Sequence, residues 1–287
     1  MVKLSGLVCV RNEEARLADC LSRLGFCDEI VVVADRCTDR TEAIALEMGA
    51  RVISGDFPLE GPRKQAGIDA CAGDWIIEID ADEWVCPALG EEIRDTIEGQ
   101  PRGDYFQIPV DNYVGARLVR RGWGGSFGAS LVGRLYRRGA KRWKDHRIHP
   151  GVIFNGTLAG ALRTPIKHTV DDDIADMVAR LNRYTDLRAL DLADTRGKMG
   201  VADNLFRGVR RFFKCYWTRK GHKEGELGLL IALMAGLYPI LSALKAREIL
   251  AQRARTEAGV GAGVYELAPA GQRRRAGNDD ERQVAAA

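Results

Sequence analysis

Residues 75–85, WIIEIDADEWV, join a buried-strand pattern to a pair of carboxylates. The first five residues are mostly aromatic or β-branched, which is typical of a strand entering a sheet. Asp80 and Asp82 lie two residues apart, so in extended chain both carboxylates would face the same side. Like charges that close repel each other unless water or a cation screens them. A divalent metal is one such cation, and we expect a charged site where this strand ends.

The chain before this stretch alternates strand patterns with helix patterns. The predicted strands cover residues 3–10, 29–35, 50–54 and 74–80. The helices predicted between them include one with apolar positions Leu17, Cys20, Leu21 and Leu24, one around Ile44 and Leu46, and one near residues 64–72. Regular alternation of this kind predicts an α/β fold with a mostly parallel central sheet covered by helices.

Polar residues fall at the carboxyl ends of three of these strands. Residues 11–14 (RNEE) follow the first strand, Asp35 and Arg36 stand at the end of the second, and Asp80 and Asp82 follow the fourth. Ligands of parallel α/β sheets bind beyond the carboxyl ends of the strands. We therefore expect these segments to converge on one site.

The motifs at these strand ends favour a nucleotide held partly through a metal. No GxGxxG follows the first strand and no GxxxxGK[ST] occurs, so neither dinucleotide nor P-loop chemistry is indicated. Asp80 and Asp82 form a DxD pair, and carboxylates suit Mg²⁺ or Mn²⁺ while leaving coordination positions open for a diphosphate. Alternatively, the two aspartates simply end a strand and cap the next helix.

Composition narrows the class of protein further. The chain has 287 residues, 46% of them hydrophobic, and a net charge of +3, which fits one large globular domain or two modest ones. Its seven cysteines form no CxxC pair, so we expect no disulfide or zinc framework and a reducing, cytoplasmic environment. The apolar run at 4–10 is too short and too early for a secretory signal.

Four segments together carry a family resemblance. They are LVCVRNEEARLADCLSRL (7–24), EIVVVADRCTDRTEAIA (29–45), GPRKQAG (61–67) and WIIEIDADEWV (75–85). In combination and order they resemble the motifs of the family 2 glycosyltransferases with a GT-A fold, above all the lipopolysaccharide core β-glucosyltransferases. The resemblance extends over roughly residues 1–250. It implies a GT-A nucleotide-sugar-binding domain followed by membrane-associated helices.

The resemblance also implies a donor and the residues that bind it. The donor would be a UDP-sugar, and the transfer of its hexose, glucose in this branch, would invert the anomeric centre. The implied roles place Asn12 and Glu13 in the nucleotide pocket, Asp35 at the base, Arg63 and Lys64 near the nucleotide, Asp80 at the ribose or a metal-bound water, and Asp82 on the metal. From the residues alone, Arg63 and Lys64 could instead belong to a solvated helix face.

An inverting displacement needs a general base for the acceptor hydroxyl. Between Asp111 and Asp171 the chain has one acidic residue, Asp145, which makes it the first candidate, with His149 second. Asp145 could equally pair with a neighbouring arginine and hold a loop. The family often carries a His-Glu pair where this chain has His149-Pro150.

The same part of the chain is strongly basic. Its cations are Arg117, Arg120, Arg121, Arg134, Arg137, Arg138, Lys141, Arg142, Lys144 and Arg147. This excess favours an anionic acceptor, such as an inner-core saccharide that bears phosphate or ulosonic acid groups. Nucleic acid is the rival polyanion, but aromatic interleaving is sparse and no DNA- or RNA-binding motif occurs.

After residue 170 the pattern becomes helical. One predicted helix begins at the acids of 171–173, and a second, within 205–223, has an aromatic face and a basic remainder. Its apolar residues are Leu205, Phe206, Val209, Phe212, Phe213, Tyr216 and Trp217, and its cations are Arg207, Arg210, Arg211, Lys214, Arg219, Lys220 and Lys223. A basic amphipathic helix of this composition is typical of an anionic membrane surface.

Residues 227–244 form an uncharged run that contains Pro239. The run is at the lower limit for a membrane span, and the proline favours a kinked or interfacial segment. We expect a helical hairpin that rests on the membrane, with a dimer interface or a single span as alternatives. From Thr256 the composition predicts a disordered tail.

The sequence thus predicts four regions and one principal function. They are a nucleotide-sugar-binding half (1–100), an acceptor-binding half (101–170), a membrane-associating helical region (171–255) and a tail (256–287). The function expected is an inverting, metal-dependent hexosyltransferase, peripheral to the inner face of the cytoplasmic membrane, with a lipid-linked acceptor from the lipopolysaccharide inner core. Alternatives are a nucleotidyltransferase or a membrane-bound scaffold with a degenerate glycosyltransferase domain.

Overall fold

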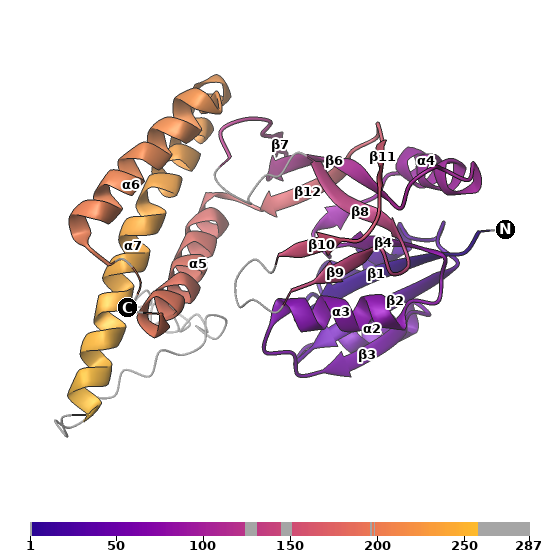
Figure 1. Cartoon of the computed structure of the whole chain (residues 1–287), viewed down its shortest axis with the longest axis horizontal. Helices are drawn as coiled ribbons and strands as arrows, with labels where there is room; N and C mark the ends of the chain where they lie inside the picture. Colours follow the sequence, from indigo (N-terminus) through magenta and orange to yellow (C-terminus); the bar gives the residue numbers. More distant parts are fainter. Residues whose placement is uncertain (1, 124–130, 145–150, 196, 198, 258–287) are drawn as a thin grey trace, which may run out of the picture.

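The computed structural model describes residues 2–123, 131–144, 151–195, 197 and 199–257. A sheet domain and a group of three long helices lie side by side, with the N-terminus at the end of the sheet domain remote from the helices (Figure 1). Asp145 and His149, the two candidate bases, lie outside the described residues, as does nearly all of the predicted tail.

The first half of the sheet is parallel, as predicted. It consists of β1 (Leu4–Val10), β2 (Glu29–Asp35), β3 (Arg51–Gly55) and β4 (Trp75–Ile79) in the order β3-β2-β1-β4. Val8 of β1 lies opposite Val32 on one side and Ile79 on the other, so the carboxyl ends of the three strands are level. This register brings the three polar segments predicted from the sequence to one edge of the sheet.

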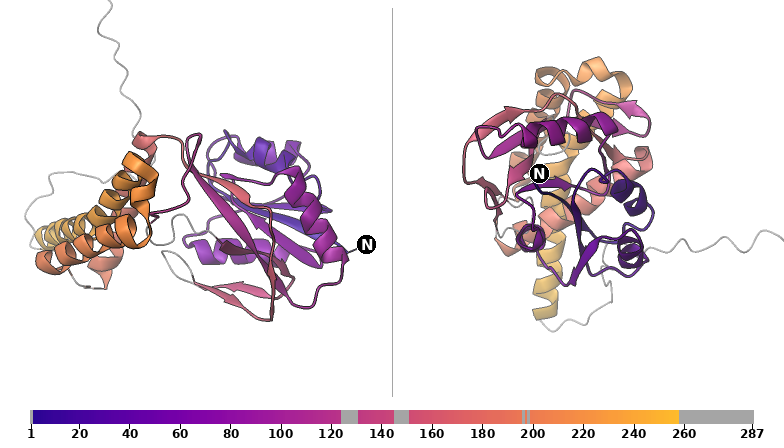
Figure 2. Two further views of the ribbon diagram at one scale, coloured as in Figure 1. Left: turned by 90° about the horizontal axis from the view of Figure 1, so that it is seen from above. Right: turned by 90° about the vertical axis from the view of Figure 1, so that its right-hand side faces the viewer.

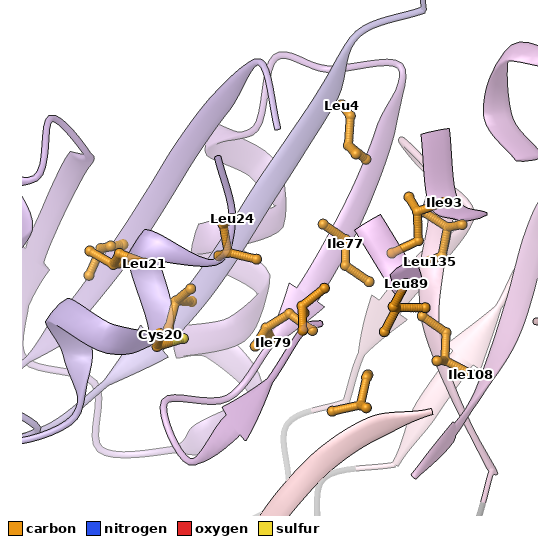
Figure 3. Close-up of a cluster of buried hydrophobic side chains, with 14 of the residues drawn as sticks. Leu4, Cys20, Leu21, Leu24, Ile77, Ile79, Leu89, Ile93, Ile108 and Leu135 are labelled. Carbon is orange, nitrogen blue, oxygen red and sulfur yellow. The ribbon is translucent and has the colours of Figure 1, made fainter. Parts of the chain in front are cut away.

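Alternate side chains of these strands enter two separate cores. Val8, Val32 and Ile77 belong to the larger core, whereas Leu7 and Val33 belong to the smaller one. Figure 3 shows the larger core, in which α1 and α4 cover the strands. Because both faces of the sheet are covered, these strands are mostly apolar.

The helices of this half are α1 (Leu17–Ser22), α2 (Thr41–Glu47), α3 (Glu60–Ala70) and α4 (Pro87–Glu98). The helix predicted near 64–72 begins earlier, at Glu60. Arg63 and Lys64 therefore both lie within α3. Leu46, predicted as an apolar helix position, is largely exposed.

The second half of the sheet mixes directions. β8 (Leu131–Arg137) pairs antiparallel with β4, β6 (Tyr105–Val114) antiparallel with β8, and β12 (Ile166–Asp171) parallel with β6. The remaining strands are β5 (Glu83–Trp84), β7 (Arg117–Leu118), β9 (Lys141–Trp143), β10 (Val152–Phe154) and β11 (Leu158–Ala161). β5 pairs with β12, so the segment after the DxD motif returns to the sheet at its far edge.

The helical region contains α5 (Ile174–Asp194), α6 (Val201–Phe213), a π-helical turn (Lys214–Thr218), a 3-10 turn (Gly221–Glu224) and α7 (Gly225–Glu257). Asp173 caps α5 by accepting a hydrogen bond from the backbone N–H of Asp176. α7 packs against both α5 and α6, beside the sheet domain (Figure 2). Gly208 of α6 lies directly against Gly236 of α7, where a Cβ on Gly208 would be 2.5 Å from the Gly236 carbonyl oxygen.

The predicted apolar run lies inside α7, which continues through Pro239. By length and composition, the helix over residues 221–256 is the one candidate membrane span in the part of the chain that the structure describes. Less than half of its most apolar window, 39%, is buried against the rest of the protein.

Candidate functional site

Two of the predicted segments are tied together by side-chain hydrogen bonds. Asn12, after β1, accepts a hydrogen bond from the backbone N–H of Thr38 (2.8 Å), and the backbone N–H of Glu13 donates to the Thr41 hydroxyl (2.8 Å). Asn12 adopts a left-handed backbone conformation (φ 55°), which asparagine tolerates better than most residues. The loops after β1 and β2 thus form one wall of the site.

Asp35 ends β2 as a buried carboxylate. It accepts hydrogen bonds from the Arg36 side chain (2.9 Å) and from the backbone N–H of Phe57 (3.0 Å), and Arg63 lies 3.7 Å away. Burial opposes its ionisation, but these donors and cations hold the pKa of Asp35 below its usual range. Arg63 therefore faces the end of β2 instead of belonging to a solvated helix face.

Asp80 is held between two cations of the protein. One carboxylate oxygen contacts the Lys64 ammonium at 3.0 Å, and the other accepts a hydrogen bond from Arg134. Burial alone would raise the pKa of Asp80, but Arg134 and Lys64 hold it well below its ordinary value. The charge that we expected a metal to screen is neutralised here by side chains.

The expectation that Asp80 and Asp82 face the same side assumed an extended chain, and the chain is not extended here. The chain turns directly after β4, with the backbone N–H of Glu83 donating to the Asp80 carbonyl (2.9 Å), so residues 80–82 are not extended. Asp80 stays on the face of the sheet that carries Glu78, whereas Asp82 contacts β12. The helix-capping alternative is also excluded, because α4 starts after Cys86 and has no side-chain cap.

A buried ionic cluster supports Asp80. Glu78 contacts Lys64 (3.2 Å) and Lys141 (2.6 Å), and Arg134 links Asp80 to Glu83 (2.6 Å). Burial opposes ionisation of Glu78, but Lys141, Lys64 and Arg134 lower its pKa to about 2. Burial lowers the pKa of Lys141 to about 8, so both partners are charged at neutral pH. Lys64 therefore has a structural role, and two of the cations predicted for an anionic acceptor belong to this cluster.

Asp82 meets a histidine that the sequence did not single out. The Nε2 atom of His168 lies 3.5 Å from the Asp82 carboxylate, and its Nδ1 atom lies 2.9 Å from the side-chain oxygen of Asn112. Burial alone would lower the pKa of His168, but Asp82, Glu83 and Asp80 raise it above its ordinary value. No sequence motif marks His168, because only the pairing of β12 with β5 brings it to Asp82.

The Asp82–His168 pair fits a divalent cation that keeps most of its ligands from substrate and water. If His168 donates its Nδ1–H to Asn112, its Nε2 lone pair is available beside the Asp82 carboxylate. No group of three or more His, Cys, Asp or Glu side chains suited to a metal occurs among the described residues. Asp80, whose oxygens are both engaged, fits a metal less well than Asp82 does.

Glu13 connects the first strand end to this pair. It is half-buried, and the loss of hydration together with the charge of Asp82 raises its pKa. Nearby, Arg16 forms an ion pair with Asp172 at the start of the helical region. The ends of β1 and β4 therefore lie close together, as the sequence predicted. The β12–α5 junction, which the sequence did not predict here, lies beside them.

Comparison with known proteins identifies the class. The family model for glycosyl transferase family 2 matches residues 5–165, which is more than half of the chain. An uncharacterised glycosyltransferase of Rickettsia prowazekii is 35% identical over 265 residues, covering 87% of this chain and 88% of that protein. The chain therefore belongs to glycosyl transferase family 2, and its α/β sheet with the DxD turn is a GT-A-like fold.

Two further proteins show how far the similarity extends. The lipopolysaccharide core biosynthesis glycosyltransferase LpsC of Rhizobium meliloti is 26% identical over 265 residues, covering 88% of this chain and 94% of that protein. Among solved structures, glucosyl-3-phosphoglycerate synthase of Mycobacterium tuberculosis, with Mn²⁺, UDP and glucosyl-3-phosphoglycerate, matches at 25% identity and a TM-score of 0.31. That match covers 39% of this chain and 44% of the other.

Proposed function

We propose that this glycosyltransferase is an inverting, metal-dependent enzyme that transfers a hexose from a UDP-sugar to a lipid-linked saccharide. The observation that carries the proposal is the Asp82–His168 pair, in which Asp82 follows β4 within the region matched by the family model. A carboxylate next to an imidazole at this position suits a cation bound to a nucleoside diphosphate.

The donor would lie along the three strand ends. Asn12 and Glu13 would line the nucleotide pocket and Asp35 would accept an N–H of the base, because each lies on the loops that form this wall. Asp80, fixed by Lys64 and Arg134, would accept a hydrogen bond from the ribose or a bound water. Arg63, which faces Asp35, would stay near the nucleotide.

Mg²⁺ or Mn²⁺ held by Asp82 and His168 would neutralise charge that builds on the departing diphosphate. The remaining steps are attack by the acceptor and transfer of its proton to a residue of the protein. The acceptor oxygen would attack the anomeric carbon as the bond to the diphosphate breaks, and UDP would leave with the electron pair. The hydroxyl proton would pass to a general base, for which Asp145 and then His149 remain our candidates.

The acceptor class rests on two independent supports. LpsC, which matches along nearly its whole length, is named for lipopolysaccharide core biosynthesis. In addition, α6 carries an exposed aromatic face with cations beside it, which suits a peripheral position on the inner face of the cytoplasmic membrane. Together they favour an inner-core saccharide on a lipid anchor, with glucose as the first hexose to test.

The decisive experiment is a donor screen with the purified protein. UDP-glucose, other UDP-hexoses and hexoses on other nucleotides are compared for thermal stabilisation and slow hydrolysis, with Mn²⁺ and with chelator. We expect stabilisation by UDP-sugars that requires the metal. Equal stabilisation by all nucleotides, or none by any, would favour the scaffold alternative, and pyrophosphate release from a nucleoside triphosphate would favour a nucleotidyltransferase.

A further inference from the structure

A polar cavity lies in the helical region, away from the Asp82–His168 pair. It has a volume of about 430 Å³ and is lined by α5, α6, α7 and the π-helical turn. Its cationic side chains are Arg188, Arg207, Arg210, Arg211, Lys214 and Arg219. No acidic residue lines it, among the residues that the structure describes.

The spacing of the α6 cations explains why they gather. Arg207, Arg210, Arg211 and Lys214 stand at positions i, i+3, i+4 and i+7, which places them on one side of the helix. The close contact of Gly208 with the Gly236 carbonyl brings α6 against α7, and the cavity forms beside this crossing. A helix with bulky residues at the crossing would stand farther from α7.

Most of the cations in this cavity have no ion-pair partner in the part of the chain that the structure describes. Arg188 has a carboxylate within 3.7 Å, that of Asp191, and Arg219 donates a hydrogen bond to the Trp123 carbonyl. Neither the three α6 arginines nor Lys214 of the π-helical turn forms an ion pair with any residue that the structure describes. Cations gathered on one side of a helix attract a multiply charged anion, because its charge offsets their mutual repulsion.

The neighbouring surface indicates where such an anion would come from. Phe206, Val209, Phe213 and Trp217 recur along another side of α6 and its π-helical continuation, and each is about half exposed or more. Phe206 is 70% exposed, an unusual state for a phenylalanine on a protein in water. An apolar face of this kind suits the boundary between lipid headgroups and acyl chains, which would bring lipid phosphates to the rim of the cavity.

We propose that this cavity is a binding site for the phosphate group of a membrane lipid. Arginine is suited to the task because its planar guanidinium donates two hydrogen bonds at once to phosphate oxygens. The site would recognise the headgroup itself, beyond the general attraction of a basic surface for an anionic membrane. The assignment of the phosphate to a lipid rests on the membrane location given under the proposed function. The binding of phosphate itself rests on the cavity.

The test compares two kinds of vesicle with the same surface potential. One contains phosphatidic acid, whose headgroup is a phosphate monoester, and the other contains an anionic lipid with a sulfonate headgroup. We expect the full-length protein to bind the phosphate vesicles about tenfold more tightly, the scale of one charge-assisted hydrogen bond. The double variant Arg207→Gln, Arg210→Gln should bind both kinds equally.

A matched control removes the same charge elsewhere. Arg247 and Arg255 are exposed on α7, outside the cavity, and Arg247→Gln with Arg255→Gln should weaken binding to both vesicles while the preference for phosphate remains. Circular dichroism of both variants checks that the helices are intact. Equal binding of the unaltered protein to the two vesicles, or loss of the preference in the control, would overturn the proposal.

Two further measurements separate the source and the activity. If inorganic phosphate at constant ionic strength binds the cavity as tightly as the vesicles do, the ligand is a soluble phosphate and the lipid assignment is wrong. Asp82→Asn should keep the phosphate preference, since it alters only the donor site. The preference for phosphate vesicles should therefore be measurable whether or not the proposed transferase activity is found. The two proposals can be contradicted independently.

Discussion

At the scale of single residues, the proposed donor site contains two aspartates whose surroundings differ. Asp80 is held by Lys64 and Arg134, whereas Asp82 faces His168. The two aspartates of the DxD pair therefore differ in their surroundings. Asp80 is a hydrogen-bonded carboxylate, and Asp82 is a candidate metal ligand.

This division predicts the effect of Asp82→Asn. An amide is a poorer ligand for a hard cation than a carboxylate, so transfer and metal-dependent UDP binding should be abolished while the fold stays intact. The measurement is UDP titration with Mn²⁺ and with chelator. Asp95→Asn, which alters an exposed aspartate on α4, is the control and should behave as the unaltered protein. Undiminished turnover in Asp82→Asn would rule out the metal role.

The general base is the second residue-scale prediction. Asp145→Asn should lower kcat by about 10²-fold or more, the usual scale for loss of a general base, with donor binding little changed. Steady-state kinetics with a soluble acceptor, together with UDP titration, measures both quantities. A near-normal kcat would direct attention to His149 or to Asp111, which lies half-buried on β6.

At the scale of elements, the junction between β12 and α5 joins the sheet to the helical region. Asp171 ends β12, where one carboxylate oxygen accepts a hydrogen bond from Arg180 of α5 (2.6 Å). The other oxygen is buried with no hydrogen-bond partner among the residues that the structure describes. Burial raises the pKa of Asp171 to about 6, although Arg180 opposes the shift.

The raised pKa of Asp171 predicts a pH dependence of stability. Between about pH 4 and pH 6 the folded protein binds a proton at Asp171 that the unfolded chain has released. The contribution is therefore fully present below about pH 4 and is lost as the pH rises through about 6. Urea unfolding across this range should show a smaller decline in midpoint for Asp171→Asn than for the unaltered protein. Identical slopes would contradict the assignment.

At the scale of the whole molecule, one side of α6 carries large apolar side chains that the rest of the protein leaves exposed. The sequence predicted seven apolar residues on this face, but Phe212 and Tyr216 are half-buried, and Phe212 contacts Gly236 of α7. The residues free to enter a membrane are therefore Leu205, Phe206, Val209, Phe213 and Trp217, of which Phe206, Phe213 and Trp217 are aromatic.

This revised face predicts how the protein binds anionic liposomes. Cations near the surface each contribute on the order of 1 kcal/mol, which salt screens, while buried aromatic side chains add a contribution that salt does not weaken. High salt should weaken flotation without abolishing it. Replacing Phe206, Phe213 and Trp217 with serine should remove the salt-resistant part.

The control for flotation replaces apolar residues that are exposed on the sheet domain. Leu46, Met48 and Leu158 are each at least 40% exposed, and serine at these positions should leave flotation unchanged. A protein that ends near Asp203 should no longer float if the helices are the anchor. Equal flotation of that protein would instead favour a packing or subunit interface for the aromatic face.

Local pattern and order along the chain were enough to predict much of this protein. The mostly apolar runs at 29–35 and 75–79 became β2 and β4 because strands buried on both faces are predominantly apolar. The polar residues after these strands converged because parallel neighbours in register end at one edge. Several of the motif residues that carry the family resemblance lie at this edge of the sheet.

Tertiary structure alone decided the contacts between distant segments. His168 reaches Asp82 only because β12 pairs with β5, and Arg134 and Lys141 enter the buried cluster only because β8 and β9 cover Glu78. Periodicity reports which side chains are buried but not which charges meet across the sheet. The basic cavity has the same origin, because its residues come from helices that are brought together by the Gly208–Gly236 crossing.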